Sequence, residues 1–249
     1  MEKSLAENLA TSAVKVQRKI RSVMSRTAET EIDKNKIPRH VGIIPDGNRR
    51  YSRIARLSYR VAYNIGYENL RSIMKELLRM GVRYLSVYAM SLDNCVKRSS
   101  EELATLHELI IRGVNELARD EDVEKNDIRV IFFGDLSLLP ERIQGKVREL
   151  EEMTASRKGG ILGVALCYSV LREIDMDKEG CERPISYRVM PPIDLVIRTG
   201  GQRRLSDFFP VNARYAELYF TEKPWPAFGI DDLYSAVKWY QSVPRNFGR

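Results

Sequence analysis

A turn rich in charged residues follows the first apolar run of the chain, with the sequence PDGNRR over residues 45–50. Arginines recur beyond it at spacings of 4, 3 and 4, which predicts one face of a helix. A loop that opens a helix exposes backbone N–H groups to an anion, and guanidinium groups add bidentate phosphate contacts. A hairpin turn at Asp-Gly and a solvated basic face are simpler alternatives. We favour a phosphate site, because the turn lies at a predicted strand end beside a carboxylate. The arginines are Arg49, Arg53, Arg56 and Arg60.

Asp46 is the acidic residue within this basic turn. Salt bridges to the neighbouring arginines would account for it. With phosphates bound, a hard divalent cation joining the carboxylate to phosphate oxygens is equally good chemistry. Mg²⁺ is typically held by one or two carboxylates together with substrate phosphates. The turn is therefore compatible with Mg²⁺ held by Asp46 and equally with salt bridges alone.

A second basic segment follows a later apolar run and extends to Phe208. Its paired glycines, Gly200 and Gly201, let the backbone approach a ligand closely. Two such segments on one sheet indicate two phosphorylated substrates held side by side. The chain contains neither GxxxxGK[ST] nor GxGxxG, so nucleotide hydrolysis and dinucleotide redox chemistry lack their usual motifs. The donors of this segment are Arg198, Arg203, Arg204 and Ser206.

The composition limits the other classes of function. The 249 residues carry a formal net charge of +7, which suits nucleic acid, an anionic membrane or a small diphosphate. Two histidines, His40 and His107, argue against a histidine metal site or a catalytic triad. No apolar run approaches the ~18 residues of a membrane span, and the N-terminus lacks a signal-peptide core. Without a CxxC pair, the cysteines predict a reduced cytoplasmic protein without structural zinc; they are Cys95, Cys167 and Cys181.

Short apolar runs alternate with helical patterns over residues 38–249, which predicts one α/β domain. Its six strands should form a mostly parallel sheet flanked by helices on both faces, because the runs show little polar alternation. Such sheets bind ligands beyond the carboxyl ends of their strands, where both basic segments begin. The predicted strands are His40–Ile44, Tyr84–Met90, Ile128–Gly134, Ile161–Cys167, Ile193–Arg198 and Leu218–Phe220, and the predicted helices are Tyr63–Met80, Ser99–Arg119, Pro140–Arg157 and Asp231–Gln241.

Residues 1–30 are predicted to form an N-terminal amphipathic helix. Apolar residues recur there three or four apart, with lysines and arginines between them. We favour a helix packed on the domain. The alternative is a surface helix that makes peripheral contact with anionic lipid. The polar stretch over residues 31–39 contains Pro38 and is interpreted as a linker.

Four separated segments carry the most specific signal. They are HVGIIPDGNRR (40–50), YAMSLDN (88–94), DLVIRTGGQRRLSDF (194–208) and YAELYFT (215–221), the last followed by Trp225-Pro226. Together they resemble the cis-prenyltransferases, the undecaprenyl diphosphate synthase family. The resemblance extends over about residues 38–249 in the family's order, and four motifs are more specific than one. The aspartate-rich DDxxD motifs of trans-prenyltransferases are absent.

The resemblance implies a Mg²⁺-dependent enzyme that condenses an allylic isoprenoid diphosphate with isopentenyl or dimethylallyl diphosphate. It implies a homodimer or a heterodimer, of which we predict the homodimer, with small isoprenoid diphosphates rather than nucleic acid as partners. The implied catalytic residues are Asp46, Arg50 and Asn94, and the implied metal ligands are Asp46 and Glu217. The allylic diphosphate would bind Gly47, Asn48, Arg49, Arg50, Tyr59 and Arg60, and the acceptor diphosphate would bind Arg198, Arg204, Ser206, Lys97 and Arg98.

The predicted helix Ser99–Arg119 has two features of interest. Ser99 followed by Glu102 indicates a capping box at its start. Its apolar stripe is typical of a helix packed on a core, and under the resemblance it could also line a tunnel for the hydrocarbon tail. That stripe consists of Leu103, Leu106, Ile110, Val114 and Leu117.

Several positions depart from the family pattern. Arg49 replaces a glycine, Tyr63 a histidine and Cys95 a tryptophan, and near the C-terminus the nearest arginine is Arg245, one position early. Because the changes concentrate around the acceptor and the reacting carbons, we hypothesise altered acceptor use, including non-head-to-tail condensation. One alternative is a low-activity subunit of a heteromeric cis-prenyltransferase. Another is an RNA- or membrane-binding module, which would leave the Asp46 turn and the paired glycines without a role.

Overall fold

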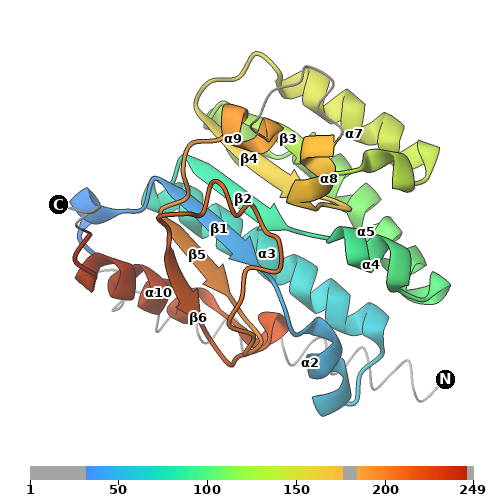
Figure 1. The fold of residues 1–249 in the computed structure, drawn as a ribbon, viewed down its shortest axis with the longest axis horizontal. Helices are drawn as coiled ribbons and strands as arrows, with labels where there is room; N and C mark the ends of the chain where they lie inside the picture. Colours follow the sequence, from blue (N-terminus) through green and yellow to red (C-terminus); the bar gives the residue numbers. More distant parts are fainter. Residues whose placement is uncertain (1–31, 176–183, 246–249) are drawn as a thin grey trace.

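The computed structural model describes residues 32–175 and 184–245. These residues form a six-stranded sheet with helices packed against it (Figure 1). The strand order is β3-β4-β2-β1-β5-β6, and every pairing is parallel. The predicted α/β class is therefore confirmed. The strands are β1 (His40–Ile44), β2 (Tyr84–Tyr88), β3 (Ile128–Phe133), β4 (Gly160–Ala165), β5 (Leu195–Arg198) and β6 (Glu217–Phe220).

Four long helices correspond to the four that the sequence predicts, with ends that differ by a few residues. They are α3 (Tyr59–Met80), α5 (Ser100–Leu117), α7 (Glu141–Thr154) and α10 (Ile230–Ser242). The shorter helices are α2 (Asn48–Ile54), α4 (Leu92–Lys97), α6 (Glu121–Lys125), α8 (Val170–Asp175) and α9 (Ile185–Val189), and short 3-10 turns occur at η1 (Lys34–Lys36), η2 (Leu136–Leu138) and η3 (Trp225–Ala227).

The two faces of the sheet are covered differently. The long helices pack on one face through a large apolar core that includes Val41, Ile43 and Ile197, all without solvent exposure. On the other face, α8, α9 and the irregular chain after β5 form a second core, in which Phe208 and Phe209 are buried. Helices therefore lie on both faces, as predicted, but irregular backbone supplies much of the second cover. That irregular chain also carries the second basic segment.

The arginines after Asp46 do not share one helical face, so that prediction was wrong. Arg49 and Arg53 lie on α2, and Arg60 lies on α3. Arg56 lies in the turn between the helices, with a left-handed φ of 52°. Ser58 then caps α3 by accepting a hydrogen bond from a backbone N–H group of its first turn. The turn redirects the chain, so Arg60 lies on a different helix from Arg49 and Arg53.

The predicted N-terminal helix, over residues 1–30, lies outside the described residues. The polar stretch that follows it forms η1 and then enters β1 directly. Among the described helices, none combines the length and the apolar character that a membrane span requires.

Candidate active site

The carboxyl ends of β1 and β5 bring the two basic segments together. Ile44 of β1 stands opposite Arg198 of β5, so the turn after β1 lies against the end of β5. Arg198 Nη2 donates a hydrogen bond to Asp46 Oδ2 at 3.0 Å, and Arg50 Nη2 lies 3.3 Å from Asp46 Oδ1. The Arg198 side chain is 5% exposed, whereas that of Asp46 is 33% exposed. Asp46 and Arg198 therefore lie close enough to contact two touching ligands.

Backbone contacts hold the Asp46 turn in place. The Asp46 carbonyl accepts a hydrogen bond from Thr199 Oγ1 at 2.8 Å. Gly200 has a left-handed φ of 80°, and a Cβ atom there would lie 2.6 Å from Arg50 Nη2 and 2.9 Å from the Asp46 carbonyl oxygen. Gly47 is also left-handed, with a φ of 101°. These two glycines allow the two segments to approach more closely than side chains would permit.

The second basic segment closes over the same edge of the sheet. Arg198 Nη1 donates to Ser206 Oγ at 2.8 Å and to the Arg204 carbonyl oxygen. Asp207 Oδ2 accepts a hydrogen bond from the Val170 N–H at 2.9 Å, which ties the segment to α8. The buried guanidinium of Arg198 thus joins the Asp46 turn to the Ser206 hydroxyl.

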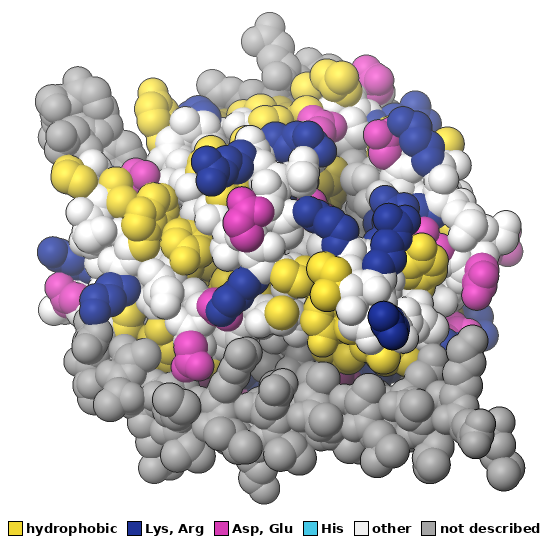
Figure 2. Space-filling view, turned by 90° about the horizontal axis from the view of Figure 1, so that it is seen from below, with side chains coloured by type: hydrophobic (Ala, Val, Ile, Leu, Met, Phe, Trp, Pro, Cys, Tyr) yellow, Lys and Arg dark blue, Asp and Glu magenta, His cyan; other side chains and the backbone are white. Residues whose placement is uncertain are grey.

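Both segments and α4 line one open polar pocket. In the view from below, Lys and Arg side chains gather on the part of the surface where α2 lies (Figure 2). The pocket includes most of the residues that the sequence singled out. Those are Asp46, Gly47, Asn48, Arg49, Arg50, Asn94, Arg98, Arg198, Arg204 and Ser206.

Three of the predicted diphosphate-binding residues do not line this pocket. Arg60 pairs with Glu108 on α5, and Tyr59 beside it is 40% exposed at the start of α3. Lys97 pairs with Asp93 of its own helix at 2.9 Å, where both side chains are mostly exposed. For Tyr59 and Arg60 the reason is the turn between α2 and α3, which directs them away from the Asp46 turn.

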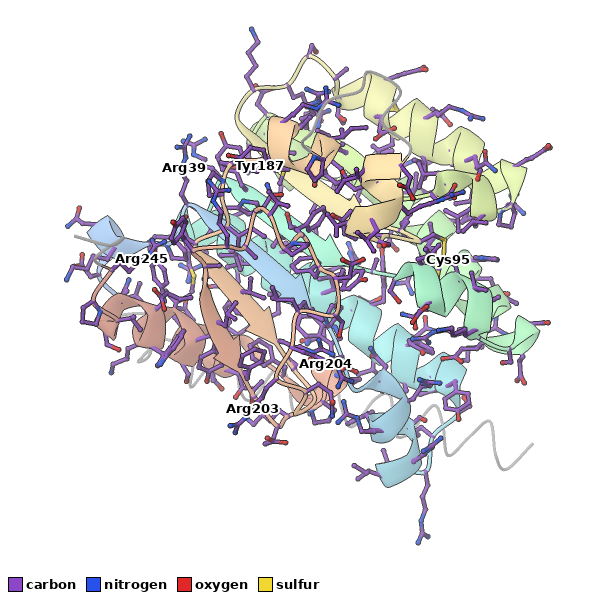
Figure 3. The ribbon with its side chains drawn as sticks, viewed as in Figure 1. Arg39, Cys95, Tyr187, Arg203, Arg204 and Arg245 are labelled. Carbon is purple, nitrogen blue, oxygen red and sulfur yellow. A yellow bond between two sulfur atoms is a disulfide. The ribbon has the colours of Figure 1, made fainter. Side chains whose placement is uncertain are left out.

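Glu217, the predicted second metal ligand, lies at the opposite end of the sheet from Asp46. It opens β6 and pairs with the first residue of β5, about 10 Å along the strand from the carboxyl end. Its carboxylate lies 3.9 Å from Arg245, which itself pairs with Asp194 at 3.0 Å. Figure 3 shows Arg245 and Arg204 at opposite ends of β5 and β6. Within one chain, Glu217 is therefore not near Asp46, contrary to the prediction, and its role as a metal ligand stays a prediction.

A buried carboxylate that the sequence did not identify as a site residue lies behind the pocket. Glu102 accepts hydrogen bonds from the Tyr63 hydroxyl and from Arg98, and Arg49 Nε lies 4.0 Å away. Burial is the main reason why the pKa of Tyr63 is raised, so the phenol stays neutral. Half of the predicted capping box is present, since Ser99 Oγ accepts from the Glu102 N–H at 3.3 Å. The Glu102 carboxylate instead fixes two side chains that line the pocket.

An apolar cavity continues from the polar pocket between the sheet, α3 and α5. It contains about 1250 Å³ of non-atom space, open mouth included. Tyr63 and Asn48 line both the cavity and the pocket, so the two spaces meet there. Most of the predicted stripe on α5 lines this cavity, namely Leu106, Ile110, Val114 and Leu117, whereas Leu103 does not.

Helix α4 is joined to the sheet by a disulfide. Cys95 on α4 bonds to Cys167, which follows β4 and is fully buried (Figure 3). The prediction of reduced thiols was wrong for this pair. The two residues are 72 positions apart in the sequence, and the pairing of β2 with β4 brings them together. Cys181 lies outside the described residues.

Comparison with known proteins identifies the family. A profile of the family described as putative undecaprenyl diphosphate synthase matches residues 44–248. This chain belongs to that family. It is therefore a prenyltransferase of the cis type, as the four motifs implied.

The relatives include two archaeal enzymes, both named tritrans,polycis-undecaprenyl-diphosphate synthase (geranylgeranyl-diphosphate specific). The one from Sulfurisphaera tokodaii is 36% identical, with 88% of this chain and 90% of the relative covered. The one from Aeropyrum pernix is also 36% identical, with 85% of this chain and 99% of the relative covered. The similarity thus extends over nearly the whole of each relative.

The solved structures give the same fold. Lavandulyl diphosphate synthase from Lavandula x intermedia, in complex with dimethylallyl diphosphate, has a TM-score of 0.78 at 26% identity. It covers 86% of this chain and 100% of its own. A probable undecaprenyl diphosphate synthase from Campylobacter jejuni has a TM-score of 0.66 at 25% identity. It covers 85% of this chain and 99% of its own.

Proposed function

We propose that this enzyme lengthens an allylic prenyl diphosphate by condensing it with isopentenyl diphosphate. The observation that carries the proposal is the continuity of the polar pocket with the apolar cavity at Tyr63 and Asn48. A prenyl diphosphate has the same two parts, a charged head and a hydrocarbon tail. Each tail methylene that leaves water contributes about 0.8 kcal/mol to binding. The archaeal relatives are named as geranylgeranyl-diphosphate specific, so geranylgeranyl diphosphate is the first substrate to test.

The allylic diphosphate binds at the Asp46 turn, where the cavity opens. Arg49 and Arg50 are the cations of that turn, and Arg98 reaches the pocket from the far side. Guanidinium groups bind phosphate oxygens in pairs, which fixes the head group while the tail lies in the cavity. Because Glu102 holds Arg98 and Tyr63, the mouth of the cavity keeps its shape before substrate binds.

The acceptor diphosphate binds at Arg198, Arg204 and Ser206. Arg198 already contacts both Asp46 and Ser206, so one guanidinium lies between the two diphosphate positions. Lys97 is exposed beside this pocket without lining it, and we assign it no contact with the acceptor. The shared arginine brings the acceptor double bond near the allylic carbon, and such positioning is a large part of catalysis in two-substrate reactions.

Asp46 is the residue that would hold Mg²⁺. Among the described residues, no group of three or more His, Cys, Asp or Glu side chains could hold a metal by itself. The partly exposed carboxylate of Asp46, which contacts Arg50 and Arg198, suits Mg²⁺, whose other ligands are phosphate oxygens and water. When bound, the ion neutralises charge on the departing diphosphate.

The reaction is an ionisation followed by addition and proton loss. The allylic carbon–oxygen bond breaks, and its electron pair leaves with the diphosphate. The acceptor double bond then attacks the allylic cation, and a proton leaves the new cation to restore an alkene. Arg50 and Arg98 stabilise the departing charge, and one well-placed donor is worth about 3 kcal/mol of barrier. Asn94 lines the pocket on α4, and we assign it to the reacting carbons, where proton loss occurs.

Product analysis of the purified chain tests this function. Geranylgeranyl, farnesyl and dimethylallyl diphosphates are each incubated with isopentenyl diphosphate and Mg²⁺. We expect polyprenyl diphosphates that are absent with a chelator and with Asp46→Ala. No product from any allylic diphosphate would contradict the proposal. Activity that appears only with a partner chain would instead identify a subunit of a heteromeric enzyme.

The likeness to lavandulyl diphosphate synthase favours a second candidate function, the non-head-to-tail condensation of two allylic units. Both diphosphate positions would then bind an allylic diphosphate. Incubation with dimethylallyl diphosphate and Mg²⁺, without isopentenyl diphosphate, should yield a ten-carbon diphosphate. Unchanged substrate in that incubation, with elongation intact in the first experiment, excludes this activity.

We also infer a homodimer, whereas a cytoplasmic location stays a prediction. β6 is an edge strand, and Tyr215 and Leu218 beside or within it are 61% and 37% exposed. A second copy would cover this edge. Light scattering should give twice the mass of 28.7 kDa.

Peripheral membrane contact through residues 1–30 stays a prediction, and co-sedimentation with anionic vesicles, with and without those residues, tests it.

A further inference from the structure

Helix α4 is held weakly by its own side chains. It has six residues, and none of them is fully buried. Val96 is 68% exposed, and the ion pair between Lys97 and Asp93 is exposed on both sides. Helices much shorter than about 12 residues are marginal in water unless packing stabilises them. The position of α4 therefore depends on its attachments to the rest of the molecule.

The attachments at the two ends of α4 are polar. Before the helix, Ser91 forms a bridge with Tyr168, and the Leu92 N–H donates to the Tyr168 carbonyl at 2.9 Å. After the helix, Arg98 is bound by Glu102. Between these two points, the attachment that holds the body of the helix is the bond from Cys95 to Cys167.

The disulfide lies next to Asn94, the residue that we assign to the reacting carbons. Asn94 lines the polar pocket and is the neighbour of Cys95 in the sequence. Cys167 lies two residues after β4 and is fully buried in the apolar core, so the core fixes its end of the bond. The disulfide therefore holds the turn of α4 that carries Asn94 in a fixed position relative to the sheet.

We propose that the Cys95–Cys167 disulfide positions Asn94 for prenyl transfer, and that its reduction lowers the activity of the enzyme. This inference rests on the proposed function of the pocket. Oxidation of the two thiols releases two protons and passes two electrons to an external disulfide. A dithiol reductant returns two electrons and two protons, regenerates both thiols and becomes a cyclic disulfide itself.

The bond is tested first, without any assay of activity. Protein purified without reductant is unfolded and its free thiols are counted. We expect one reactive thiol per chain, from Cys181, and three after reduction. Peptide mapping under non-reducing conditions should contain Cys95 linked to Cys167. Three free thiols before reduction would overturn the proposal.

The positioning role is tested by a double-mutant cycle. We expect reduction to lower kcat of the wild type about tenfold, because misplacement by about 1 Å costs one to two orders of magnitude. Asn94→Ala removes the positioned group, so reduction should then lower kcat less than twofold. Equal losses in both proteins would show that the bond acts on general stability and not through Asn94.

Matched variants separate the bond from the presence of thiols. Cys95→Ser and Cys167→Ser should each reproduce the reduced wild type and be insensitive to reductant. Cys181→Ser should retain full activity and full sensitivity. Hydrogen exchange of the amides of residues 92–97 should accelerate on reduction. If no allylic diphosphate is converted, the proposed function fails, whereas the thiol count and the exchange still test the attachment of α4. Unchanged exchange on reduction would overturn the inference.

Discussion

The two ends of β5 each carry an aspartate–arginine pair at 3.0 Å, yet the pairs differ in what surrounds them. At the carboxyl end, Asp46 contacts the side chains of Arg198 and Arg50 beside an open pocket. At the amino end, Asp194 contacts the side chain of Arg245 and also accepts hydrogen bonds from two backbone N–H groups. Side chains can move to a ligand, whereas backbone donors cannot. We therefore propose that the pair at the carboxyl end serves a ligand, whereas the pair at the amino end serves the fold.

The amino end is closed by further buried polar contacts. His40 is fully buried; its Nδ1 bonds to the Pro191 carbonyl oxygen at 2.9 Å, and its Nε2 lies 2.9 Å from Ser86 Oγ. Because a carbonyl oxygen only accepts, Nδ1 carries the proton and Nε2 accepts from the serine in the neutral ring. This end also contains Glu217, so the acidic residue that resembles a metal ligand lies in a structural network. Four substitutions should distinguish the two ends.

Replacing Asp46 should have the largest effect. We expect Asp46→Asn to lower kcat by ~10²–10³-fold with little change in stability, because an amide would hold Mg²⁺ more weakly than the carboxylate and the charge on the departing diphosphate would be less well neutralised. Steady-state kinetics and thermal unfolding measure the two quantities. The matched control is Glu121→Gln, since Glu121 is 79% exposed on α6. A variant that keeps more than a tenth of the activity would contradict the role of the carboxylate.

Acid should destabilise the amino end. Burial lowers the pKa of His40 from 6.5 to about 4, so the unfolded chain binds more protons between these values. Stability from this group is complete above pH 6.5, and about 3 kcal/mol is lost as the pH falls to 4. Urea unfolding measures the free energy of unfolding. Between pH 6.5 and pH 4 this free energy should fall by about 3 kcal/mol more in the wild type than in His40→Gln. Equal pH profiles for His40→Gln and the wild type would refute the assignment.

Replacing Asp194 should reverse the pattern seen for Asp46. Asp194→Asn keeps one acceptor oxygen but loses the charge that faces Arg245, so we expect a loss of about 2 kcal/mol in unfolding free energy. At temperatures where the variant is folded, kcat should stay within about threefold of the wild type. A hundredfold loss of kcat in a folded variant would mean that both ends of β5 take part in the reaction.

A methyl group at Gly200 should have the smallest effect, because it removes no charged or hydrogen-bonding side chain. The left-handed φ and the 2.6 Å approach to Arg50 predict about 1 kcal/mol of strain and a moderate rise in KM. A Cβ atom at Gly145 on α7 would have no neighbour within 4 Å, so Gly145→Ala should stabilise the protein slightly. Equal stability changes for the two variants would contradict the close approach at Gly200.

The fold could largely be predicted because its signals are local. Apolar runs without alternation identified the buried parallel strands, and the long amphipathic helices followed from their periodicity. Helix α4 was not predicted, because six residues with no buried side chain leave no periodic pattern. The helix proposed for the four arginines was also wrong, since the left-handed turn at Arg56 has no glycine to indicate it.

The site could be predicted only in part. Asp46, Arg198 and Ser206 lie together because the carboxyl ends of neighbouring parallel strands meet at one edge, which is a rule that a sequence can invoke. The roles of Tyr63 and Glu102 were missed, because their contact joins α3 to α5 across 39 positions.

The amino-acid sequence by itself determined the class of chemistry: hydrophobic periodicity selected a parallel sheet, and residue types at two strand ends selected phosphate binding. Only the tertiary structure decided which acidic residue faces the pocket, which cysteines are joined and where the apolar cavity opens. Those outcomes depend on distances between residues far apart in the chain. Such distances arise from the packing of whole elements, which no local pattern encodes.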